Sequence, residues 1–292
     1  MNSIVSSVRE GRTLISDGAW GTMLIRAGLQ PQMCPESWNI GRPEQVSDVA
    51  KAYAQVGADL VTTNSFGGTR FKLTHYGLAN HVAEINRAAA MLSRNAVGPN
   101  VHVMASIGPT GKLLLMEDVT EQEMYDAFRE QAVALEEGGA DACCIETMAA
   151  LDEAGLAIHA AKENTKLEVV STFTFGAKVE DGYRTIMGVS PAEAANFAIN
   201  AGADIVGTNC SQGPAQMLEI VREMRAAAPD AVILVQPNAG LPIHTDAGDS
   251  YPETPTSMAE YFQALRAVGA NIIGGCCGTT PEHIRALVAA RG

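Results

Sequence analysis

AGADIVGTNC, residues 201–210, is one of four versions of a phrase that recurs along this chain of 292 residues. In each version a predicted helix ends at Gly-Ala-Asp or Gly-Ala-Asn, and an apolar run rich in β-branched residues follows. Glycine suits the end of a helix, so each phrase predicts a turn from a helix into a strand. The other versions are VGADLVTTN (56–64), GGADACCIET (138–147) and VGANIIGGCC (268–277).

Four more apolar runs bring the number of predicted strands to eight. They are TLISDG (13–18), VHVMASIGP (101–109), EVVSTFTF (168–175) and AVILVQPNAG (231–240). Helical periodicity covers the sequence between the strands and after the last one, at 44–56, 80–97, 121–137, 151–163, 191–201, 213–228, 256–268 and 281–291. Eight alternations of strand and helix are typical of a single (β/α)8 TIM barrel, an α/β fold of about 250 residues. We therefore predict one barrel domain over residues 1–292. A doubly wound open sheet is disfavoured because no Gly-x-Gly-x-x-Gly follows the first strand.

The composition of the chain argues against some classes of binding partner. The formal net charge of −13 argues against nucleic acid and anionic membrane surfaces, so a small substrate is expected. The N-terminus lacks a basic segment followed by a long apolar one, and no run approaches the roughly 18 apolar residues of a membrane helix. We expect a cytoplasmic protein. Its six cysteines are too few for a disulfide framework in a chain of this length, which leaves core residues, metal ligands or reactive thiols.

The predicted strands end in polar residues. In a barrel the active site lies at the C-terminal mouth, so these strand ends predict a site. In chain order they are Asp17-Gly18, Thr63-Asn64, Gly108-Pro109, Glu146-Thr147, Thr174, Asn209-Cys210, Asn238 and Cys276-Cys277.

Three of these residues are cysteines. Alternate strands of a barrel send side chains into common layers, so Cys210 on the sixth strand and the pair Cys276-Cys277 on the eighth can converge. Neighbouring residues of a regular strand face opposite ways, so the pair can share one centre only where the strand has ended, and the surrounding glycines permit that. Three thiolates around Zn²⁺ with the fourth position open are the ligands of a catalytic zinc. Such an anionic centre suits a thiol substrate held as thiolate, for attack on an electrophilic carbon such as a methyl group.

Seven motifs resemble the zinc-dependent homocysteine S-methyltransferases, in order and across nearly the whole chain. They are DGAWGT (17–22), TTNSFGGTR (62–70), GPTG (108–111), IET (145–147), GTNCSQGP (207–214), QPNAGLP (236–242) and GGCCGTTPEHI (274–284). The resemblance implies that Cys210, Cys276 and Cys277 bind Zn²⁺, that the sulfur of homocysteine takes the fourth position, and that methionine is the product. It also implies that the amino-acid end of homocysteine is bound by Asp17, Gly18, Thr63 and Glu146, with Glu146 facing the ammonium group.

The methyl donor is less well defined by the motifs. FGGTRFKL (66–73) and PNAGLP (237–242) look most like the homocysteine barrel of cobalamin-dependent methionine synthase, which implies a methylcorrinoid protein supplied in trans. Relatives that use betaine carry aromatic residues where Cys34 and Gly67 stand here. Trp20, Trp38 and Tyr76 could still form an aromatic box, which keeps betaine or another onium donor as the alternative.

Two other kinds of function are weighed against methyl transfer. The glycines around Cys276 and the helix after them resemble a phosphate cradle, which would suit a barrel lyase or isomerase, but they leave Cys210 unexplained. Lys178 is the one lysine near a strand end, so Schiff-base chemistry has little support. The third hypothesis is a non-catalytic accessory protein that binds zinc or a corrinoid.

Several residues also have ordinary structural explanations. Cys143-Cys144 lies within the fourth strand, so we expect it to fill the core. Asp17 and Asn238 could be turn residues, and Glu146 could belong to a structural network. The loop 240–256 could cover the site or contact a partner.

Overall fold

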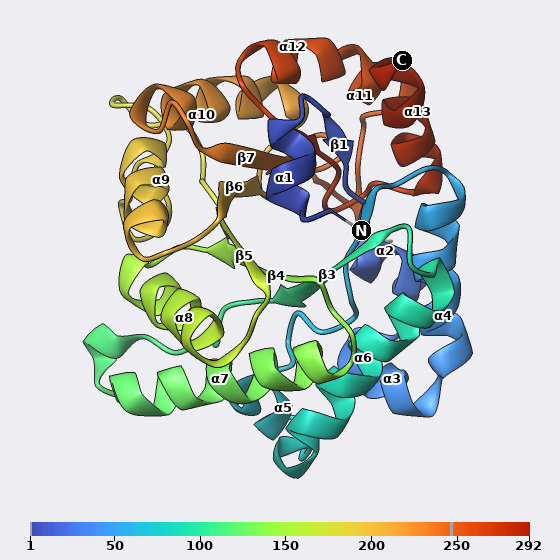
Figure 1. Cartoon of the computed structure of the whole chain (residues 1–292), viewed down its shortest axis with the longest axis vertical. Coiled ribbons are helices and arrows are strands. Elements are labelled where there is room, and N and C mark those ends of the chain that lie inside the picture. The colour runs from blue at the N-terminus through green and yellow to red at the C-terminus, as the bar shows by residue number, and fades with distance from the viewer. Residues whose placement is uncertain (1, 246–247) are drawn as a thin grey trace.

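The predicted α/β barrel is present in the computed structural model, which describes residues 2–245 and 248–292. Within these residues, eight parallel strands form one sheet in the order β1-β10-β7-β6-β5-β4-β3-β2, with helices around it (Figure 1). A bridge between Ser16 and Leu60 joins the two ends of this order, and the Asp17 N–H donates to the Leu60 carbonyl at 3.0 Å. The strands are β1 (Leu14–Ile15), β2 (Leu60–Val61), β3 (His102–Ile107), β4 (Ala142–Met148), β5 (Glu168–Phe173), β6 (Ile205–Asn209), β7 (Val232–Gln236) and β10 (Ile272–Ile273).

The longer helices lie where periodicity predicts them, and the short ones are new. Helices of four to seven residues, such as α1, α2, α3 and α5, are too short to show an apolar stripe. The predicted helix 256–268 is two helices, divided at Tyr261. The α-helices are α1 (Ile4–Arg9), α2 (Trp20–Arg26), α3 (Trp38–Gly41), α4 (Pro43–Gln55), α5 (Arg70–Thr74), α6 (Val82–Val97), α7 (Glu121–Glu137), α8 (Leu151–Asn164), α9 (Pro191–Asn200), α10 (Pro214–Ala227), α11 (Pro255–Glu260), α12 (Phe262–Ala267) and α13 (Pro281–Arg291).

The segment 240–256 is not only a loop. It contains the antiparallel strands β8 (Ile243–Thr245) and β9 (Gly248–Ser250). Residues 246–247 of the predicted loop lie outside the described residues. In the part of the chain that is described, no helix is both long enough and apolar enough to cross a membrane.

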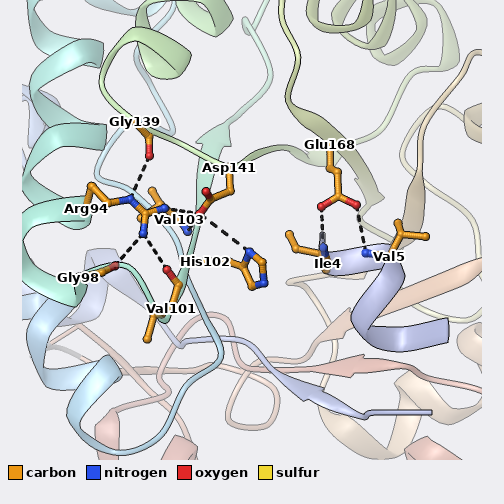
Figure 2. Close-up of polar contacts among 10 residues, drawn as sticks. All are labelled: Ile4, Val5, Arg94, Gly98, Val101, His102, Val103, Gly139, Asp141 and Glu168. Carbon is orange, nitrogen blue, oxygen red and sulfur yellow. Dashed lines mark hydrogen bonds and ion pairs between the residues drawn. The ribbon is translucent and has the colours of Figure 1, made fainter. Parts of the chain in front are cut away.

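Helix α1 covers the end of the barrel opposite to the mouth, and it lies in front of the strands in Figure 1. Ile4 and Val8 pack against the apolar side chains inside the barrel at this end. The Glu168 carboxylate accepts hydrogen bonds from the N–H groups of Ile4 at 2.7 Å and Val5 at 3.1 Å, as Figure 2 shows. These bonds satisfy two amides at the start of a helix, so they fix α1 to β5.

A second polar cluster stabilises the same end of the barrel. Arg94 on α6 donates to the carbonyls of Gly98 at 2.8 Å and Val101 at 2.9 Å, and it pairs with Asp141 before β4 (Figure 2). Asp141 in turn accepts from the N–H of Val103 on β3 at 2.8 Å. The arginine therefore ties α6 to the neighbouring strands β3 and β4.

The inside of the barrel changes from apolar to polar toward the mouth. Met104, Cys144 and Leu234 lie in the apolar layer. Because residues two apart face the same side of a strand, the next inward positions are occupied by Ser106, Glu146 and Gln236. The core role predicted for Cys143-Cys144 is confirmed, since both side chains are buried. The polar layer forms the base of the site.

Candidate active site

Three cysteine side chains meet at the mouth of the barrel. Cys210 directly follows β6, and Cys276 and Cys277 follow β10. The Sγ atoms of Cys210 and Cys277 are 3.8 Å apart, and all three Sγ atoms lie within 4.8 Å of one another. The structure therefore brings together the three cysteines that the sequence singles out.

Irregular backbone allows this convergence. Cys210 has a φ of 62° and Ser211 a φ of 58°, a left-handed conformation that is uncommon for residues other than glycine. The Cys210 N–H donates to the Gln236 carbonyl at 3.1 Å, and the Cys276 N–H donates to the Pro237 carbonyl at 2.7 Å. Both cysteine backbones are thus held by the end of β7. Strained backbone that is fixed in this way is typical of functional sites.

The geometry of the cluster fits a tetrahedral metal ion. Two sulfurs that each lie about 2.3 Å from a tetrahedral centre are about 3.8 Å apart, and the Cys210–Cys277 separation matches this edge. Hydrogen bonds from Cys210 and then Cys276 hold the pKa of Cys277 well below its usual value. Hydrogen bonds with Cys210 and Cys277, together with burial, raise the pKa of Cys276 well above its usual value. The thiols alone therefore favour a single thiolate, and a bound divalent cation would supply the charge that allows more of them to ionise.

Glu146 lies at the end of β4, in the polar layer. Its Oε1 accepts from Ser106 Oγ at 2.5 Å, and its Oε2 accepts from Asn209 Nδ2 at 3.1 Å. Burial raises the pKa of this carboxyl to about 7. Among the described residues, no basic side chain lines the cavity around Glu146. A cationic group of a ligand would therefore stabilise the negative charge of its carboxylate.

Asn209 connects the acid to the cysteine cluster. This fully buried side chain contacts Glu146, and its Nδ2 lies 3.9 Å from Cys276 Sγ. Its Oδ1 accepts from the N–H of Thr147 at 2.9 Å and from Thr172 Oγ1 at 2.8 Å. These bonds also hold Thr147 at a φ of 62°, an unusual conformation for a β-branched residue.

One cavity of about 290 Å³ contains the cysteines and the acid. Of the predicted residues, Gly18, Thr63, Glu146 and the three cysteines line it. The full lining is Gly18, Ala19, Trp20, Gly21, Thr22, Leu24, Pro35, Glu36, Thr62, Thr63, Asn64, Ser65, Phe66, Ser106, Glu146, Thr147, Cys210, Gln236, Gly275, Cys276 and Cys277. The volume is suited to a small substrate.

Asp17 lies behind the cavity wall and does not line it. Its carboxylate is fully buried and accepts from Thr62 N–H at 2.7 Å and from Trp20 Nε1 at 2.8 Å. Burial raises its pKa to about 6, against the effect of these bonds. Asp17 therefore holds in place two residues that do line the cavity. Gly18 is required because a Cβ there would lie 2.6 Å from Thr279 Oγ1.

The aromatic box does not form in the described part of the chain. Of its three candidates, Trp20 lines the cavity. Trp38 is buried under Arg42, whose guanidinium lies 4.8 Å from the ring centroid, and Tyr76 is exposed after α5. Lys178 does not line the cavity either. Its side chain is exposed, and its Nζ forms an ion pair with Glu219 Oε2 at 2.5 Å.

Several residues of the cavity are not predicted from the sequence, including Ser106, Gln236, Glu36 and Phe66. Ser106 and Gln236 could have been found, because each is a polar residue two positions beyond an inward apolar one. Glu36 lies in a short 3-10 helix, Pro35–Ser37, between α2 and α3, and its Oε1 accepts from the Gly67 N–H at 2.6 Å. No sequence pattern marks that contact.

Comparisons with known proteins give a consistent result. The family described as "Homocysteine S-methyltransferase" matches residues 14–291. "Methionine synthase" of Mycobacterium leprae is 32% identical over 96% of this chain, although the chain spans only 24% of that protein. "Homocysteine Methyltransferase MmuM" of Escherichia coli, in its oxidized form, has a TM-score of 0.81 at 21% identity and covers 99% of both chains. Its metallated form gives the same TM-score and identity over 98% of this chain and 99% of that one.

Proposed function

The chain belongs to the homocysteine S-methyltransferase family, and we propose that it transfers a methyl group to the sulfur of homocysteine to form methionine. The observation that carries this proposal is the cavity that joins three converging thiols to the buried acid Glu146. One end of that cavity suits a sulfur ligand through a metal, and the other suits an ammonium group. We propose that residues 1–292 act as one homocysteine-binding unit.

Cys210, Cys276 and Cys277 are proposed to hold Zn²⁺. A zinc ion with three thiolate ligands and an open position would bind the homocysteine sulfur and keep it as a thiolate at neutral pH. The spacing of Cys210 and Cys277 supports this assignment, because it equals a tetrahedral edge. Thiol ligands have to remain reduced, which agrees with the expected cytoplasmic location.

The chain's own residues would orient the amino-acid end. Glu146, held by Ser106 and Asn209, would accept hydrogen bonds from the ammonium group. The Gly18 N–H is available to the carboxylate, since it donates to no protein group among residues 2–245 and 248–292. Thr63 is proposed as a second contact, and Asp17 as the residue that fixes the neighbouring wall through Trp20 and Thr62. With both ends held, the sulfur meets the methyl carbon in a fixed orientation.

The methyl donor is proposed to be a methylcorrinoid protein supplied in trans. The similarity to part of a methionine synthase supports this kind of donor, together with the motifs FGGTRFKL and PNAGLP. The surroundings of Gly67 disfavour an aromatic cage, because a Cβ there would lie 2.8 Å from Glu36 Oε1. Of the three candidates for an aromatic box, Trp20 lines the cavity, and it keeps betaine or another onium compound as the alternative. A phosphate ligand is disfavoured, since the described cavity wall lacks Lys, Arg and His.

Two measurements test the proposal. Elemental mass spectrometry of the protein purified without chelator should find one zinc per chain. Methionine formation should then be assayed with methylcobalamin, betaine and S-methylmethionine as donors. Turnover with methylcobalamin supports the corrinoid donor, and turnover with an onium compound supports the alternative. Zinc and homocysteine binding without turnover from any donor would indicate an accessory protein.

A further inference from the structure

The segment between β7 and α11 is fixed at both ends beside a metal ligand. The Ala239 N–H donates to the carbonyl of Cys277 at 2.9 Å. The Glu253 N–H donates to the carbonyl of Ala239, also at 2.9 Å. Chain 239–253 therefore leaves the neighbourhood of Cys277 and returns to it, with its two ends joined as in an Ω-loop.

The start of α13 holds this junction from the other side. His283 Nδ1 lies 3.2 Å from the Thr280 N–H, which is a donor, so this nitrogen accepts. His283 Nε2 then carries the proton and donates to the Glu253 carbonyl at 3.0 Å. The junction is thereby fastened to the helix that follows Cys276 and Cys277.

Tyr251 is the side chain that this segment places over the cysteine turn. At Gly278, φ is 80°, and a Cβ would lie 2.2 Å from Tyr251 Cγ and 2.5 Å from Cδ2. The tyrosine ring thus packs directly against the backbone that follows Cys277. Its side chain also hydrogen-bonds Cys277. Gly278 is needed for both its backbone conformation and the space that it leaves for the ring.

We propose that Tyr251 is a positioning residue for Cys277, whose sulfur it holds in the metal-binding arrangement by donating a hydrogen bond from the hydroxyl group. The inference rests on the proposed function, because it assumes that the three cysteines bind a metal. Partners behind the ligands of a metal fix their orientation, and loss of one typically costs 10- to 100-fold in metal affinity. This contact gives Tyr251, a described residue of the segment 240–256, a role beside the cysteines.

The test compares zinc affinity in the full-length wild type and in Tyr251→Phe. The phenylalanine keeps the ring against Gly278 and removes only the hydroxyl. We expect competition with a chromogenic chelator to give a zinc dissociation constant about 10- to 100-fold weaker than that of the wild type. With Co²⁺ in place of zinc, the thiolate-to-cobalt charge-transfer band should shift. Tyr261→Phe, at the junction of α11 and α12, is the matched control and should leave both measurements unchanged.

A second variant tests the hydrogen bond between Tyr251 and Cys277 by a change at Gly278. Gly278→Ala should push the Tyr251 ring away and weaken zinc binding at least as much, and adding Tyr251→Phe to it should cause little further loss. Equal zinc affinities and identical cobalt spectra for wild type and Tyr251→Phe would overturn this inference alone. A wild type that takes up no zinc would overturn the proposed metal function and this inference with it.

Discussion

Replacing Glu146 by Gln should weaken homocysteine binding and leave the metal in place. The carboxylate accepts from Ser106 and Asn209, and Asn209 also contacts Cys276 of the cysteine cluster. Glutamine is nearly the same size but carries no charge, so the variant loses the charge-assisted bond to the ammonium group. Hydrogen bonds to charged groups contribute about 1.5–3 kcal/mol, which corresponds to about a 10- to 150-fold weaker dissociation constant.

Isothermal titration of the zinc-loaded protein with L-homocysteine measures this effect. Glu153→Gln is the matched control, because Glu153 is a buried acid that binds Thr110 at 2.7 Å and does not line the cavity. It should bind homocysteine normally, and Glu146→Gln should retain one zinc per chain. If Glu146→Gln binds homocysteine as tightly as the wild type, the assignment of the ammonium site is wrong.

The same pair of proteins provides a test by pH. Burial raises the pKa of Glu146 to about 7, and the carboxylate is the form that binds an ammonium group. Lowering the pH from 8 to 6 should therefore reduce the ionised fraction, and with it the affinity, by about tenfold. The homocysteine thiol also titrates, so the quantity to compare is the difference between wild type and Glu146→Gln. A pH dependence that is identical in both would exclude Glu146 as its source.

Three further outcomes are expected. Cys210→Ala should lose its zinc by elemental analysis, whereas Cys143→Ala, a core change in β4, should retain zinc and activity. Glu168→Ala removes the acceptor for the N–H groups of Ile4 and Val5, so urea denaturation should show about 1–2 kcal/mol less free energy of unfolding, with homocysteine binding unchanged. L-cysteine lacks one methylene between sulfur and ammonium and should have a kcat/KM about 10- to 200-fold lower than L-homocysteine; equal values would contradict a site that fixes both ends.

The barrel and the cysteine cluster could be predicted because both depend on periodic features. Each Gly-Ala-Asp or Gly-Ala-Asn phrase marks a helix end and a strand start, so strand order follows from chain order. Once the strands are placed, the ends of β6 and β10 fall at the same mouth, and Cys210, Cys276 and Cys277 follow. Cys143-Cys144 was separated from them by its position within β4 rather than after it.

Contacts made by loops and very short helices could not be predicted from periodic patterns. Asp17 is at a strand end, as expected, but its carboxylate turns toward Thr62 and Trp20. Glu36 lines the cavity and accepts a hydrogen bond from the Gly67 N–H. Tyr251 hydrogen-bonds Cys277 from the connection between β7 and α11. Except for Asp17 and Trp20, which are close along the chain, these partners are far apart in sequence and share no period, so only the folded chain brings them together.

The charges in the cavity explain how an amino acid could be oriented without a basic residue. Glu36 and Glu146 line the described wall, and no Lys, Arg or His does. A zwitterionic ligand would find a charged side chain for its ammonium group only, and Glu146, which Asn209 joins to the cysteines, would then determine which way it lies. Its carboxylate would be left with neutral donors, of which the Gly18 N–H is one. Since Asn209 contacts both Glu146 and Cys276, it would hold the proposed ammonium and thiol sites at a fixed separation, and the cavity would then select a ligand by the distance between its sulfur and its nitrogen.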